Sequence, residues 1–140
     1  MVVADVVWLI AHGGSGFAHQ ALRNALVYSV GVGGLLAGLG HTVFRDQVAD
    51  SIGWPKGNPF QIEVGFANVA IGVAGVLCAW YAGRFWLATI VIVSVYLASA
   101  AVVHVVDMVR SSNYAPGNAG FVFWWDLALP ALLVVLYAVQ

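Results

Sequence analysis

Charged residues are scarce in this sequence. Only 8% of its 140 residues are Asp, Glu, Lys or Arg, against roughly 25% in an ordinary soluble domain, while 62% are hydrophobic. The formal net charge of −1 offers no basic surface of the kind that binds nucleic acid, so no such partner is expected. The composition excludes a soluble globular domain and predicts an integral protein of the cell (inner) membrane, surrounded by the lipid bilayer.

Cysteine is also scarce, and the N-terminal run does not read as a cleavable leader. The single cysteine, Cys78, leaves no disulfide framework and is interpreted as a small apolar packing residue. The apolar N-terminal run contains Asp5 and lacks the basic start and clean cleavage site of a signal peptide. Residues 2–12 are too few to cross a bilayer, which takes about 20 residues. We expect residues 1–20 to form an interfacial or re-entrant segment.

Four longer apolar stretches follow, separated by loops rich in glycine, proline, asparagine and serine. They predict an all-α fold, a single integral membrane four-helix bundle over residues 21–140. The expected helices cover about 21–50, 59–82, 85–110 and 120–139. Asn58 before Pro59 is typical of a helix start, and Pro130 predicts a kink because it removes a backbone N–H from the last helix.

Small residues line one face of each of the first two helices, at alternating spacings of three and four. The first seam is Gly31, Gly34, Gly38, His41 and Arg45, and the second is Gln61, Gly65, Asn68, Gly72, Gly75, Ala79 and Ala82. In lipid, such a seam predicts the close approach of another helix. A further small face (Glu63, Ala67, Ala70, Ala74) predicts packing on two sides of the second helix, at the bundle centre or against a partner. A homo-oligomer or a larger membrane complex is therefore expected.

The strongly polar residues within the helices fall at one end of the expected bundle. If the helices alternate in direction, the ends of the first and third and the starts of the second and fourth share a membrane face. The residues there are His41, Arg45, Asp46, Glu63, His104, Asp107 and Asp126. Each ionisable group at membrane depth costs about 2.5–3.5 kcal/mol, so such groups pair or serve a function. Carboxylates outnumber guanidinium groups here, which predicts protonation, hydration or a bound cation.

Imidazoles and carboxylates projecting inward from four helices are the ingredients of a bundle metal site. We identify His41, Glu63, His104, Asp107 and Asp126 as candidate ligands of a divalent transition metal (Zn, Fe or Mn), with a proton as the other possible cation. The supporting residues are Arg45, Asp46, Gln61 and Asn68. The third helix carries His-x-x-Asp instead of the Glu-x-x-His repeat of carboxylate-bridged metal pairs. The residue types therefore match such a site, but the sequence motif does not. No catalytic residue is assigned.

The block GNPFQIEVGFAN (57–68), preceded by Gly53, Trp54 and Pro55, resembles a family of small prokaryotic membrane proteins of unknown function. In that family the motif PFQxEVGFAN opens the second helix, and the segment from His41 to Asp46 looks like part of the same pattern. The resemblance covers residues 20–140. It implies a four-helix membrane protein without an assigned activity, in which Gln61, Glu63 and Asn68 do more than pack.

Three functions remain open at this point. The first is a cation-binding polar centre, metal-dependent or protonic, which bound transition metal would favour. The second is proton or small-ion transport by an oligomer, which unchanged flux in Glu63→Gln and Asp126→Asn would exclude. The third is an accessory or structural subunit of a larger membrane complex, for which stoichiometric co-purification is the test.

Overall fold

The computed structural model describes residues 3, 5–7 and 16–140, and over these residues the chain is helical without any strand. Four stretches are long and apolar enough to cross a membrane, namely Phe17–Val43, Phe60–Leu77, Arg84–Ser111 and Pro116–Val139. The prediction of an all-α fold is thereby confirmed over these residues, as is the prediction of four helices long and apolar enough to cross a membrane. The interfacial segment expected at residues 1–20 lies largely outside the described residues, and residues 17–20 already belong to the first span.

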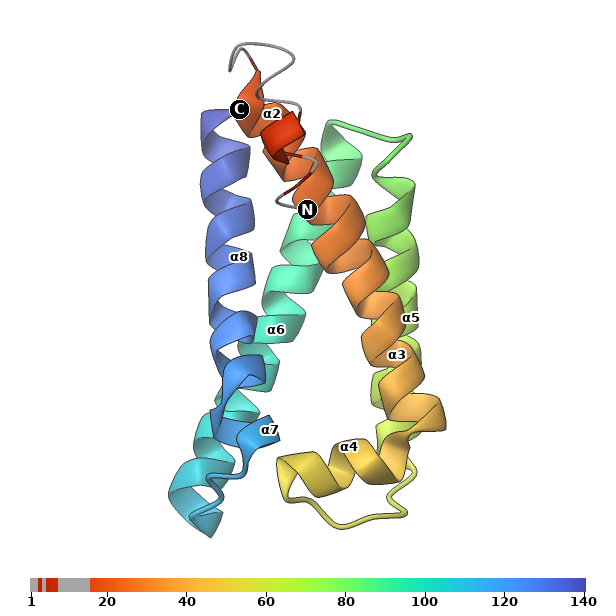
Figure 1. Cartoon of the computed structure of the whole chain (residues 1–140), viewed down its shortest axis with the longest axis vertical. Coiled ribbons are helices and arrows are strands. Elements are labelled where there is room, and N and C mark those ends of the chain that lie inside the picture. The colour runs from red at the N-terminus through yellow and green to blue at the C-terminus, as the bar shows by residue number, and fades with distance from the viewer. Residues whose placement is uncertain (1–2, 4, 8–15) are drawn as a thin grey trace.

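The first span is one helix made of three consecutive parts. These are α2 (Phe17–Asn24), a π-helical stretch η1 (Ala25–Val32) and α3 (Gly33–Val43). The backbone leaves the helical conformation at Phe44 (φ −106°, ψ 29°), and α4 (Arg45–Ile52) runs across the end of the bundle (Figure 1). The helix expected at 21–50 is therefore interrupted, and its polar last turns form a separate short helix that buries Ala49 and Ile52.

Two glycine seams hold α3 and η1 against α5 (Phe60–Leu77). A Cβ atom added at Gly75 would lie 2.6 Å from the Cα of Gly31, and one at Gly34 would lie 2.9 Å from the Cα of Gly72. Neither position has room for a side chain. The predicted close approach is confirmed, and it joins the first two spans to each other.

The third and fourth spans form the other pair. α6 (Arg84–Ser111) packs along α8 (Phe121–Val139), which follows the short helix α7 (Pro116–Ala119). The main buried cluster joins this pair to the first span and to Cys78. Its members are Leu22, Ala25, Leu26, Val30, Cys78, Trp86, Ile90, Val93, Leu129 and Leu133. Beyond this cluster α3 and α6 diverge towards the end that α4 and α7 close (Figure 1).

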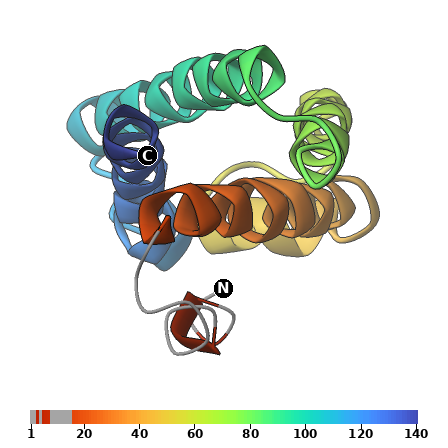
Figure 2. The ribbon, with the colours of Figure 1, turned by 90° about the horizontal axis from the view of Figure 1, so that it is seen from above.

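Seen from above, the four spans form a ring in which α5 lies between α3 and α6 and no helix occupies the centre (Figure 2). The second small face of α5 is not covered by the described residues: Glu63 and Ala70 are exposed, and Ala67 and Ala74 are partly so. The predicted place at the bundle centre is thus not what the structure shows. Many large apolar side chains, such as Val95 and Val102, also lie on the outside, as a lipid environment requires.

Candidate functional site

All four spans contribute to a cavity of about 690 Å³ between the two helix pairs. Its walls are mainly apolar, with Leu36 from α3, Ile71 from α5, Leu97 from α6 and Leu129 from α8. Small-molecule sites in proteins have volumes of roughly 300–1,000 Å³ and this kind of lining. The cavity is therefore of the right size and character to hold a small apolar molecule.

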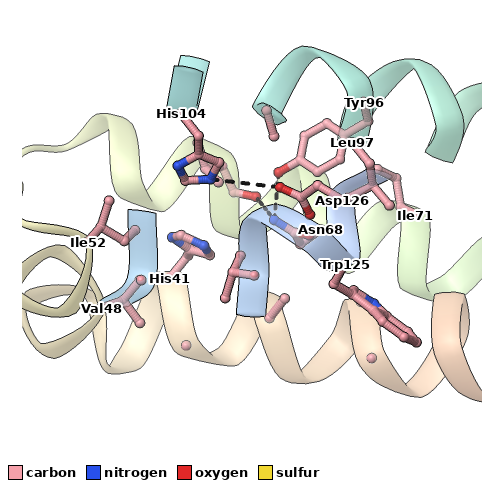
Figure 3. A pocket seen from close by; sticks show the side chains of 18 of the residues that line it. His41, Val48, Ile52, Asn68, Ile71, Tyr96, Leu97, His104, Trp125 and Asp126 are labelled. Atoms are coloured by element: carbon pink, nitrogen blue, oxygen red, sulfur yellow. Dashed lines mark hydrogen bonds and ion pairs between the residues drawn. The ribbon is translucent and has the colours of Figure 1, made fainter. Parts of the chain in front are cut away.

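Polar groups gather at the end of the cavity nearest α4 and α7, here called the polar end (Figure 3). It consists of His41, Trp54, Asn68, Tyr96, His104 and Asp126. These residues come from α3, the 53–59 loop, α5, α6 and α8. The alternation of helix direction brings His41, His104 and Asp126 to the same half of the bundle, while Tyr96 lies about two helical turns from His104 along α6.

The buried pair His104 and Asp126 lies at the centre of the polar end. The two residues are 7% and 6% exposed, and His104 Nε2 is 3.8 Å from Asp126 Oδ2. That separation allows an ion pair but exceeds the range of about 2.7–3.2 Å for a direct hydrogen bond. In the described part of the chain no residue donates a hydrogen bond to the Asp126 carboxylate. The pair thus has unused hydrogen-bonding capacity.

The other nitrogen of His104 is fixed by Asn118, which is fully buried. His104 Nδ1 lies 2.6 Å from Asn118 Oδ1, while Asn118 Nδ2 donates to the carbonyl of Asn113 at 2.7 Å. Because this second bond orients the amide, Asn118 presents an acceptor and His104 Nδ1 carries the proton. The Nε2 atom therefore faces Asp126.

A second network ties the loops behind His104. Asp107 Oδ2 accepts hydrogen bonds from Asn113 Nδ2 (2.6 Å) and from Trp54 Nε1 (2.8 Å). The ring of Trp54 stacks near that of His104, with centroids 6.3 Å apart. Asp107 thus acts outside the cavity as a support that positions Trp54 against His104.

On the α3 and α5 side, two further contacts shape the polar end. His41 Nδ1 and Gln61 Oε1 are 2.6 Å apart, so a polar contact between α3 and α5 follows the glycine contacts of the seam. Asn68 Nδ2 donates to the hydroxyl of Tyr96 at 2.7 Å and to the carbonyl of Val64 at 2.9 Å. His41, a member of the first seam, thus contacts α5 through Gln61.

The nine predicted site residues are thus divided between several environments. His41, Asn68, His104 and Asp126 line the cavity, and Gln61 bonds to His41. Glu63 is exposed, Asp107 belongs to the loop network, and Arg45 pairs with Asp46 at 3.8 Å on α4. Among the residues that the structure describes, no three His, Cys, Asp or Glu side chains are grouped closely enough to hold a metal ion. The five-ligand metal centre consequently has no support in the geometry.

Helix geometry explains this dispersal. Glu63 is two residues from Gln61, a rotation of about 200°, so it points away when Gln61 faces α3. The break at Phe44 carries Arg45 and Asp46 off to α4. Sequence reasoning missed Asn113 and Asn118, because in a loop containing Ser, Pro and Gly they read as ordinary turn residues.

By their length and composition, the four spans are those of a helical protein of the membrane-spanning class. The chain belongs to a family of unknown function, DUF6790, whose model matches residues 1–140. No curated protein and no solved structure matches the chain. The motif PFQxEVGFAN and a prokaryotic distribution of the family stay predictions.

Proposed function

We propose that this protein binds a small lipophilic molecule within the bilayer. The observation that carries the proposal is the cavity, which combines about 690 Å³ of space, apolar walls from all four spans and one buried polar end. A molecule with an apolar body and a single polar group matches this distribution. Its body would contact the apolar walls, and its polar group would pair with the polar end instead of remaining unpaired in lipid.

The cation-binding hypothesis fits this proposal in its protonic form. His104 and Asp126 supply one base and one acid at the polar end, 3.8 Å apart, so a single proton on either residue gives an ion pair or a neutral pair. A shared proton makes the pair neutral overall, which is the least costly state at membrane depth. We therefore assign a proton, and not a divalent metal, as the cation of this centre.

The test is photolabelling of the purified protein in lipid vesicles with a diazirine derivative of hexadecanol. We expect saturable labelling of cavity residues, which an excess of unlabelled hexadecanol suppresses. Ala100→Leu adds a larger side chain to the cavity wall and should reduce the labelling several-fold. Ala98→Leu is the matched control, because Ala98 lies two residues away on the exposed side of α6.

Equal labelling of the two variants would contradict the proposal. So would labels spread without saturation over the lipid-facing side chains, since the probe would then report only its concentration in the bilayer.

A further inference from the structure

We infer that the polar group of the bound molecule is a hydroxyl that bridges His104 Nε2 and Asp126 Oδ2, so that the ligand class is a lipophilic alcohol or phenol. This inference rests on the proposed function and specifies its ligand. It follows from the distance between these two atoms, from the tautomer of His104 and from the number of protons that His104 and Asp126 hold together.

The distance excludes a direct hydrogen bond between the two atoms, so a third atom beside them can bond to both. A direct hydrogen bond would need about 2.7–3.2 Å, whereas the Nε2 to Oδ2 separation is 3.8 Å. An oxygen atom located beside the pair, roughly 2.8 Å from each of the two atoms, bonds to both with ordinary hydrogen-bond lengths. Both residues line the cavity, so a ligand inside it can supply that oxygen (Figure 3).

The tautomer and the charge define what the bridge must do. With Nδ1–H donated to Asn118, a neutral His104 turns a lone pair towards Asp126. Two facing acceptors repel each other, and one shared proton removes this conflict while leaving the pair neutral. Whether the proton resides on Nε2 or on the carboxyl group, one partner then donates and the other accepts.

A hydroxyl satisfies both partners at once, because it accepts one hydrogen bond and donates one. An ether or a ketone can only accept. A carboxylate can only accept and adds a negative charge, and an ammonium group can only donate and adds a positive one. The neutral hydroxyl is therefore the group that pairs every atom without introducing an unpaired charge at membrane depth.

The apolar walls of the cavity determine where the apolar body of the ligand lies. Leu97, Ile71, Val93 and Leu129 line the same cavity as Asp126 (Figure 3). The ligand body consequently extends from the polar end along α6 and α8, towards the main buried cluster.

The experiment is a competition series against the diazirine derivative of hexadecanol in vesicles. The competitors are hexadecanol, its methyl ether, palmitate and hexadecylamine. We expect hexadecanol to compete about tenfold better than the ether, the effect of one well-formed hydrogen bond. Asp126→Leu should abolish this preference, whereas Asp50→Asn, which changes an exposed carboxylate that pairs with Lys56 outside the cavity, should retain it. Circular dichroism confirms that both variants are folded.

The possible failures are distinguishable. If labelling is saturable in the cavity but the alcohol and the ether compete equally, the hydroxyl bridge is refuted, water fills the gap, and the proposed function stands. Stronger competition by palmitate or hexadecylamine also refutes the hydroxyl class. If no saturable labelling occurs, the proposed function itself fails.

Discussion

Replacing Gly75 by alanine tests whether backbone contact between the first two spans stabilises the fold. The new Cβ would lie 2.6 Å from the Cα of Gly31, whereas ordinary carbon contacts are about 3.5–4.0 Å. The two helices would have to separate by about 1 Å. A gap of that size removes roughly a quarter to a half of the dispersion attraction of each contact along the seam.

Gly33→Ala is the matched control, because the nearest atom to its added Cβ is the carbonyl oxygen of Tyr28 at 3.7 Å. Both changes bring the same helix-propensity gain of about 0.5–1 kcal/mol. This gain cancels in the comparison, so the difference between the variants reflects overpacking, which costs about 1–3 kcal/mol. We expect Gly75→Ala to be the less stable of the two by that amount.

The assay is unfolding in detergent micelles by titration with sodium dodecyl sulfate, followed by circular dichroism. Equal free energies of unfolding for the two variants would refute the reasoning. That result would mean that the helices tolerate a wider spacing and that the glycines are not needed for contact.

Three further changes probe the polar contacts. Asn118→Leu leaves the His104 N–H and a loop carbonyl without their partner, and should lower the free energy of unfolding by about 1–3 kcal/mol in the same titration; a smaller change would argue that water replaces the amide. Trp54→Phe keeps a ring near His104 but loses the N–H bonded to Asp107, so the 53–59 loop should be cleaved faster by proteases, and an unchanged rate would contradict this role. Arg23→Met removes the hydrogen bond to the carbonyl of residue 79 at the end of α5 and should cost about 0.5–1.5 kcal/mol, again measured by unfolding.

The seams were predictable because helix contact in lipid depends on small residues at a short, regular spacing. The spacing of the glycines from Gly31 to Gly38 contains this information locally. The start of α5 was predictable for a similar reason: just before the helix, the side chain of Asn58 accepts the N–H of Phe60, the first residue of α5, at 2.9 Å.

The contacts of the polar residues were less predictable, because they depend on helix rotation and on loops far away in the sequence. The seam pattern continues through Arg45, and neither proline nor glycine marks the break at Phe44, so the sequence reads as one long helix. Likewise, Asp107 lies one helical turn from His104, yet Trp54, fifty-three residues earlier, and Asn113 draw it into a loop network.

The pairing of the spans has a consequence for how the protein is made. Each pair consists of neighbours in the sequence, α3 with α5 and α6 with α8, so each can insert into the membrane as a hairpin before the other has formed. Because the first hairpin is joined by backbone contacts of its own, it can form while the second is still being synthesised. The cavity, whose walls come from both hairpins, exists only after they associate. Two separately expressed halves, divided at Gly83 in the turn before α6, should therefore assemble in the membrane, and the binding site should arise in that last step.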